Sequence, residues 1–169
     1  MAVRVLENQS TKVKAIVALA GLAVGGAIVA GIANYTYTQH RLEQCAQLVE
    51  NIDRGHSTIL AFRGEDAAAH GRFADRLRAV AIDLDELDLS DRRLRAYRSE
   101  FASTYRYFAT KYDSIATILT EVNEVKPNFA GLQTIEGHRK KMANTAHNIE
   151  QRAREADRLA EQVIGYCQL

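Results

Sequence analysis

Proline and tryptophan are nearly missing from this chain, which has one proline and no tryptophan among its 169 residues. Proline interrupts a helix because it lacks a backbone N–H and fixes its φ angle. The most frequent residues are instead alanine, leucine, arginine and glutamate, which are strong helix formers. The composition therefore predicts an all-α fold, with its one break of this kind at Pro127.

An excess of charge of one sign is also missing. The whole chain has 22 basic and 21 acidic residues. The first fourteen residues hold three of the basic residues and one of the acidic ones, which leaves 19 against 20 in the remainder. A domain that binds nucleic acid usually presents a clear basic face. The near-neutral remainder therefore argues against binding to nucleic acid.

Motifs of enzymes and metalloproteins are absent from the sequence as well. The two cysteines, Cys45 and Cys167, are too far apart for CxxC redox or CxxCH haem-attachment motifs. Di-metal centres in helical bundles need Glu-x-x-His motifs, and the chain has none. His56 and His70 fall on predicted inward faces, but two ligands do not make a site, and Ser57 lacks a triad acid at motif spacing. We expect a non-enzymatic protein with no catalytic, cofactor-binding or metal site.

One long apolar run stands out, the nineteen residues from Ala15 to Ala33. As a helix it would span about 28 Å, close to the roughly 30 Å hydrocarbon core of a bilayer. The basic residues before it place the N-terminus in the cytoplasm by the positive-inside rule. We therefore predict a cytoplasmic N-terminus at 1–14, a transmembrane signal anchor at 15–35 and a domain at 36–169 in the periplasm or a lumen.

The apolar run has an alternative interpretation and a further feature. Gly31-Ile32-Ala33 resembles a signal-peptide cleavage site, so secretion after cleavage near Ala33 is the alternative. The run exceeds the usual 7–15 residues of a signal-peptide core, which favours the anchor. Gly21 and Gly25 have the small-xxx-small spacing that lets a second transmembrane helix approach, so they are candidates for helix pairing.

Apolar residues recur every three or four positions over four later stretches, as in amphipathic helices with coiled-coil-like faces. The stretches run from Leu42 to Ile59, from His70 to Leu87, from Leu94 to Val122 and from Leu132 to Tyr166. Short loops between such helices favour antiparallel neighbours. The predicted fold is a single transmembrane helix followed by an antiparallel up-down four-helix bundle.

Local signals set the ends of these helices. Gly64 fits the end of the first helix, and the second begins near Glu65-Asp66. Ser90 is the predicted cap of the third helix. The segment Lys126-Pro127-Asn128 separates the third helix from the fourth.

The cysteine positions follow from the helix count. Four up-down helices return the C-terminus to the end of the bundle where the chain enters, so Cys167 and Cys45 would lie near each other. In an oxidising compartment two such cysteines often form a disulfide, which we predict between Cys45 and Cys167. Two buried free thiols are the alternative.

The predicted third and fourth helices are longer than the first two, so they should project about 20 Å beyond them as a hairpin. Two helices cannot fully bury their apolar side chains, which here are Ile115, Leu119, Val122, Phe129, Leu132 and Ile135. A basic run, His138 to Lys141, lies beside them. The candidate residues for binding a protein partner are Lys126, Phe129, Arg139, Lys140 and Lys141. An ordinary hairpin with a solvated basic face is the alternative.

Three segments carry a family resemblance. They are Leu87-x-Leu89-Ser90-Asp91, then Leu94-x-x-Tyr97-Arg98-x-x-Phe101-x-x-x-Tyr105, and the closing Val163-Ile164-x-Tyr166-Cys167-Gln168. In these the chain resembles a group of uncharacterised cyanobacterial proteins that are membrane-anchored or exported. The resemblance implies a helical extracytoplasmic domain with a cysteine at each end, at the plasma membrane or the thylakoid. The group has no known activity, so no functional residue is transferred from it.

The predicted function is non-enzymatic interaction, scaffolding or assembly at the membrane, with a protein partner or a second copy of the chain. A sensor-like ligand-binding bundle is one alternative. Another is a small-molecule or pigment carrier that uses the aromatic series from Tyr97 to Tyr112, although this spacing is more typical of a simple core.

Overall fold

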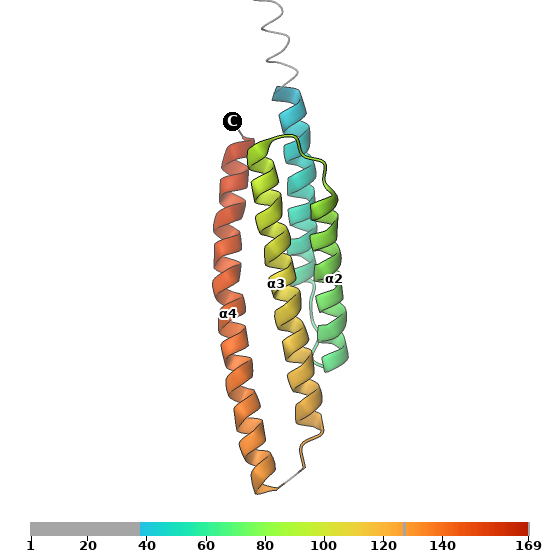
Figure 1. Cartoon of the computed structure of the whole chain (residues 1–169), viewed down its shortest axis with the longest axis vertical. Helices are drawn as coiled ribbons and strands as arrows, with labels where there is room; N and C mark the ends of the chain where they lie inside the picture. The colour runs from blue at the N-terminus through green and yellow to red at the C-terminus, as the bar shows by residue number, and fades with distance from the viewer. Residues whose placement is uncertain (1–37, 127, 169) are drawn as a thin grey trace, which may run out of the picture. The chain divides into compact units, whose positions relative to one another are not determined.

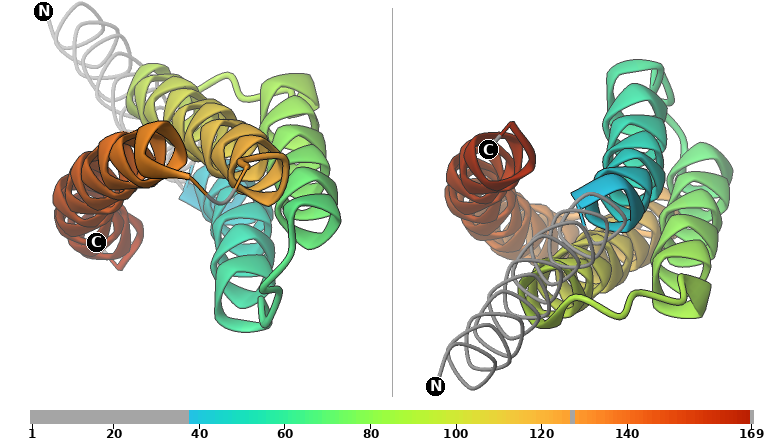
Figure 2. Two further views of the ribbon diagram at one scale, coloured as in Figure 1. Left: turned by 90° about the horizontal axis from the view of Figure 1, so that it is seen from below. Right: turned by 90° about the horizontal axis from the view of Figure 1, so that it is seen from above.

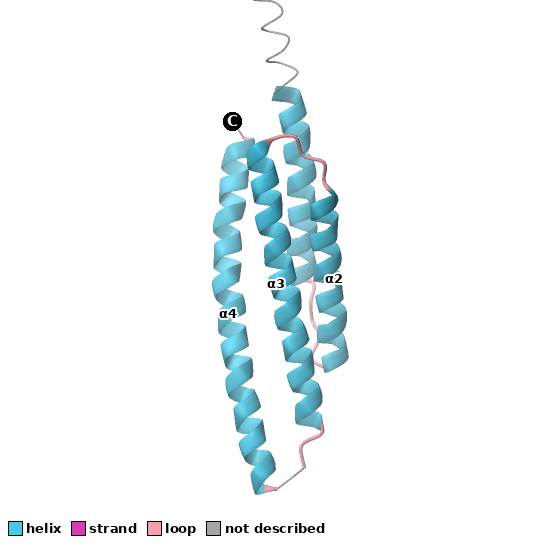
Figure 3. Cartoon of the chain, viewed as in Figure 1, coloured by secondary structure: helices cyan, strands magenta, loops and turns pink. Residues whose placement is uncertain are grey.

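The computed structural model describes residues 38–126 and 128–168, which form four helices and contain no strand (Figures 1 and 3). The helices cover residues 38–60, Ala67–Glu86 (α2), Arg92–Asn123 (α3) and Phe129–Cys167 (α4). The predicted all-α fold with four helices is therefore confirmed. Glu43–Leu169 forms one compact unit, and it contains all the sites considered below.

The predicted membrane segment cannot be located in this structure. Residues 1–14 and 15–35, together with Gly21 and Gly25, lie outside the described residues. Among the helices that are described, none is long and apolar enough to cross a membrane.

Successive helices of the Glu43–Leu169 unit run in opposite directions, as Figure 1 shows. α3 packs against α2 on one side and against α4 on the other (Figure 2). Arg54 in the first helix pairs with Asp83 of α2, with 2.9 Å between Nη2 and Oδ2. Arg106 of α3 pairs with Asp85 of α2. Two acidic residues near the end of α2 therefore bridge helices.

Side-chain caps define where the helices begin. The carboxylate of Asp66 accepts a hydrogen bond from the Ala69 N–H (2.6 Å), and α2 starts directly after it. The prediction that Ser90 caps α3 is wrong: Asp91 is the cap and accepts from two backbone N–H groups. A carboxylate can accept both bonds at once and favours the positive end of the helix dipole. Ser90 instead accepts a hydrogen bond at 2.7 Å from Nε2 of Gln44.

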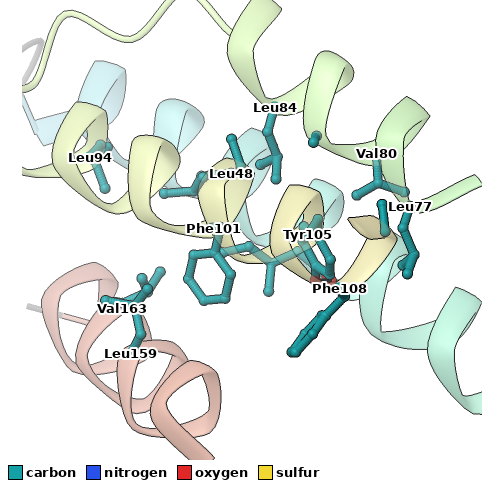
Figure 4. Close-up of a cluster of buried hydrophobic side chains, with 14 of the residues drawn as sticks. Leu48, Leu77, Val80, Leu84, Leu94, Phe101, Tyr105, Phe108, Leu159 and Val163 are labelled. Atoms are coloured by element: carbon teal, nitrogen blue, oxygen red, sulfur yellow. Dashed lines mark hydrogen bonds between the residues drawn. The ribbon is translucent and has the colours of Figure 1, made fainter. Parts of the chain in front are cut away.

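The core is a single cluster of leucine, alanine and aromatic side chains from all four helices (Figure 4). The buried positions of α2 and the first half of α3 follow the predicted spacing, from Phe73 to Leu84 and from Leu94 to Phe108. From α4, Leu159 and Val163 join the cluster, facing Phe101 in Figure 4.

The inward face of the first helix follows the predicted spacing only in part. Cys45 and Ile52 are buried as the spacing from Leu42 predicts. Leu48 and Gly55 are buried as well, whereas His56 is exposed.

At Gly55, an added Cβ would overlap the ring of Tyr105. Because glycine has no apolar side chain, the apolar spacing could not indicate that Gly55 is buried. The missing side chain lets the Tyr105 ring approach the helix backbone. The Tyr105 hydroxyl then donates a hydrogen bond to the carbonyl oxygen of Ile52 (3.0 Å).

A group of aromatic rings closes one end of the core. Phe62, from the loop after the first helix, stacks on Phe73 with ring centroids 4.2 Å apart. Tyr112 meets both rings edge-on, and His70 contacts Phe62 and Tyr112. His70 therefore serves as a packing residue.

Beyond these aromatic rings, α3 and α4 continue side by side (Figure 1). This is the hairpin that the helix lengths predicted. We call residues 113–148 the distal hairpin and the rest of the Glu43–Leu169 unit the four-helix part. No residue of the distal hairpin that the structure describes belongs to the core cluster.

The opposite end of α4 is held in three ways. Cys167 is paired with Cys45 of the first helix, with Cα atoms 5.8 Å apart, a separation that a disulfide spans. The Tyr166 hydroxyl donates to the carboxylate of Asp91 (2.8 Å), and the guanidinium of Arg93 lies over the Tyr166 ring at 5.3 Å. The last turn of α4 is thereby tied to the start of α3 and to the first helix.

Candidate functional site

The tip of the distal hairpin exposes three large apolar side chains on α4. Phe129 is 76% exposed, Leu132 66% and Ile135 41%. Together with Val125 and Lys126 of the loop before α4, they border a groove of about 540 Å³. We call Phe129, Leu132 and Ile135 the apolar tip, and the groove beside them the tip groove. The sequence predicted that a two-helix projection would leave this surface open, and the exposure of these three residues confirms it.

The loop before α4 explains why Phe129 and Leu132 point outward. Asn128 caps α4 by accepting from the Gly131 N–H at 2.8 Å, and its own N–H donates to the Lys126 carbonyl at 2.9 Å. Gly131 is buried against this loop, where a Cβ would overlap the Lys126 carbonyl oxygen. The face of α4 that carries Gly131 therefore turns inward. Phe129 and Leu132, on the other side of the helix, turn outward.

Two cations and one acid follow the apolar tip along α4. Arg139 binds Glu136 through Nε and Nη2 at 2.8 and 2.9 Å, and Lys140 lies 3.9 Å from the same carboxylate. The hydrogen bond from Arg139 is the main cause that lowers the pKa of Glu136. Glu136 lies four residues after Leu132, so these charges continue the outward face. One carboxylate neutralises one of the two cations, and this surface keeps a net positive charge.

The basic run from His138 to Lys141 does not form one face. His138 is only 8% exposed and points toward α3, where its Nδ1 lies 3.5 Å from a carboxylate oxygen of Glu121. Lys141 borders a different groove of about 420 Å³ between the two helices, lined mainly by polar residues such as Asn144. An unbroken basic face therefore does not exist, because successive helical residues point in different directions.

The remaining predicted apolar residues of the hairpin are less exposed than those at the tip. Ile115, Leu119 and Val122 on α3 are all half-buried. The apolar surface is thus concentrated on the first two turns of α4. Of the five candidate partner-binding residues, Lys126 and Phe129 border the tip groove and Arg139 and Lys140 follow it, while Lys141 lies apart.

A third groove, of about 440 Å³, lies in the four-helix part between the first helix, α3 and α4. The aromatic side chains Phe101, Tyr105 and Phe108 border it from α3, and α4 contributes alanines. The sequence favoured a simple core for the aromatic series and kept a small-molecule carrier as the alternative; Phe101, Tyr105 and Phe108 are buried in the core and also border this groove. The available signal for the groove was the alanine series 153, 156 and 160 on α4, where larger apolar residues would have filled the space.

Clustered metal ligands are not found in the part of the chain that the structure covers, where no three His, Cys, Asp or Glu side chains are grouped to hold an ion. The acidic residues Asp83 and Asp85 are occupied by arginine partners from neighbouring helices. No known protein-family model, curated protein sequence or solved structure matches this chain significantly.

Proposed function

We propose that this protein is a membrane-anchored, non-enzymatic interaction protein that binds a protein partner through the apolar tip. The observation that carries the proposal is the exposure of Phe129, Leu132 and Ile135 together around one groove. Contiguous exposed apolar side chains rimmed by polar ones are typical of interaction sites. The apolar run at 15–33 and the resemblance to anchored or exported cyanobacterial proteins support the anchored location.

The tip is suited to binding because the fold does not depend on it. These three side chains lie outside the core cluster, so their apolar character adds little to the stability of the four-helix part. Leaving them in water forgoes roughly 25 cal/mol for each Å² of apolar surface, which a partner would recover by covering it.

The charges beside the tip indicate the chemistry of the partner. Arg139 and Lys140 share the single carboxylate of Glu136, so a second carboxylate can be accommodated next to them. A matching partner would insert an apolar side chain into the tip groove and place an acidic residue over Arg139 and Lys140. A second copy of the chain would bring the same net positive surface against itself, whereas a partner with an acidic residue would not. A protein partner of this chemistry is therefore favoured over a second copy of the chain.

The test is site-specific photocrosslinking in native membranes. A photoreactive phenylalanine analogue replaces Leu132 in the full chain, and a control chain carries it at Ile82, an exposed residue of α2. We expect a crosslinked protein at 132 and none at 82. The same complex should weaken at least tenfold with Phe129→Ser and severalfold with the Arg139→Glu, Lys140→Glu double variant.

Three outcomes would overturn the proposal. One is equal crosslinking at 82 and 132, and a second is a complex that survives both sets of substitutions. The third is a crosslinked product that consists of two copies of this chain, or of lipid alone. Circular dichroism and thermal unfolding of each variant show whether the four-helix part is intact.

A further inference from the structure

The groove between the first helix, α3 and α4 has two kinds of wall. Its floor on α3 is aromatic, with Phe101, Tyr105 and Phe108 all buried. The α4 wall consists of the small side chains of Ala153, Ala156 and Ala160 together with Asp157. Apart from Asp157, α4 meets this region with methyl groups, and a space of about 440 Å³ remains where larger side chains would otherwise interlock.

Two acidic residues from different helices border this groove. Asp53 borders it from the first helix and Asp157 borders it from α4, with His56 beside Asp53. Within the part of the chain that the structure describes, neither carboxylate takes part in a salt bridge, and no Lys or Arg borders the groove. The acids on the two walls therefore make the mouth of an apolar groove negative.

The negative charge of Asp53 also affects Tyr105 on the α3 side of the groove. Burial is the main cause that raises the pKa of the Tyr105 hydroxyl, and the charge of Asp53 raises it further. A cation at the mouth of the groove would be attracted by the carboxylates of Asp53 and Asp157. The aromatic rings of α3 would attract it as well. An anion would be repelled by both carboxylates.

We propose that this groove binds a small organic cation with an apolar body, such as an arylalkylamine. The apolar body lies against Phe101 and Phe108 and the alanines of α4, and the ammonium group lies between Asp53 and Asp157. This site is separate from the apolar tip, so it gives the protein a ligand-binding function beyond partner docking.

The test compares three probes of one shape and different charge: 4-phenylbutylamine, 4-phenylbutanol and 4-phenylbutyrate. Each is titrated into the methyl-labelled full chain in lipid nanodiscs, with empty nanodiscs as the reference for partition into lipid. We expect the amine to shift the methyl signals of Ile52 and Ala156 but not that of Ile82. We expect the alcohol to bind at least fivefold more weakly and the butyrate not to bind detectably.

Two sets of variants identify the walls. The Asp53→Asn, Asp157→Asn double variant should bind the amine about fivefold more weakly and the alcohol equally well, whereas Asp88→Asn should change neither. Ala156→Leu should weaken both probes at least tenfold by filling the groove, and Ala143→Leu, at an exposed position of α4, is its control. Ala153→Leu serves in place of Ala156→Leu if the latter variant unfolds.

The proposal is wrong if the butyrate binds as tightly as the amine, since charge would then have no role. It is equally wrong if Ala156→Leu and Ala153→Leu both fold and leave amine binding unchanged. A failure of this test would leave the crosslinking result at the apolar tip unaffected, because no residue is shared between the two sites.

Discussion

The four-helix part and the distal hairpin contain the same two helices, α3 and α4, but hold them together differently. In the four-helix part, Phe101 meets Leu159 and Val163 inside a continuous apolar core. In the distal hairpin, buried residues are few and include the polar His138, and the groove between the helices is lined mainly by polar side chains.

The hydroxyl groups of distal α3 do not join the two helices. Ser114, Thr117 and Thr120 each donate a hydrogen bond to the backbone carbonyl four residues earlier, at 3.0 Å. These bonds satisfy the hydroxyls within one helix and add no link to α4. The distal hairpin is thus an extension supported by the four-helix part. Segments with few apolar contacts open at low free energy, and binding surfaces are often drawn from them.

The largest contrast is expected from matched leucine truncations in the two regions. Leu77→Ala removes a fully buried side chain and should lower the free energy of unfolding by about 2–5 kcal/mol. Leu132→Ala removes an exposed one and should change it by less than about 0.5 kcal/mol. Urea unfolding followed by circular dichroism measures both values. Similar losses at the two positions would show that the distal hairpin is part of the core.

The next effect concerns the Cys45–Cys167 pair, which closes a loop with a sequence separation of 122 residues. Reduction should lower the free energy of unfolding by about 2–4 kcal/mol, because the cross-link restricts the unfolded chain. The Cys45→Ser, Cys167→Ser variant should show the same loss and no further response to reductant. Hydrogen exchange should speed up in the last turns of α4 more than near Ile118.

A thiol count on the native, unreduced protein provides the direct check. Two cysteines that react with a maleimide before any reductant is added would contradict the disulfide. The alternative of two free thiols would then hold.

Tyr105→Phe should cost less than Leu77→Ala or reduction of the disulfide, and its cost should depend on pH. At pH 7 the variant loses the hydrogen bond to Ile52, a cost of about 1 kcal/mol. Burial raises the pKa of Tyr105 above its ordinary value of 10.0, so above pH 10 the unfolded chain loses the proton first. The contribution of the tyrosine to stability is therefore complete below pH 10 and decreases above it. Unfolding curves at pH 7 and pH 10.5 should show a smaller penalty for the variant at the higher pH, and an unchanged penalty would refute this.

The sequence predicted much of this architecture because helical periodicity is a local property. The inward faces of α2 and α3, from Phe73 to Leu84 and from Leu94 to Phe108, followed directly from apolar residues spaced three and four apart. The break at 126–128 followed from the single proline, and the projection of α3 and α4 followed from helix lengths. The exposure of Phe129 followed from this projection, because no third helix packs over it there.

Features that depend on contacts between distant residues were missed. The burial of Gly55 is decided by the ring of Tyr105, fifty positions later in the chain. Ser90 was predicted to cap α3, but its hydroxyl accepts a hydrogen bond from Gln44 of the first helix, and Asp91 is the cap. His138 was counted with the basic residues beside it, yet the packing of α3 against α4 places it inside.

The sequence by itself determined an all-α chain of four helices with a longer final pair, because composition, apolar spacing and helix length are written in consecutive residues. Only the tertiary structure decided which side chains meet: the ring of Tyr105 at Gly55, the acids Asp53 and Asp157 across one groove, and the isolation of His138 from its basic neighbours. Those outcomes depend on the rotation and separation of neighbouring helices. Rotation and separation are set by the packing of all side chains at once, so no single stretch of sequence specifies them.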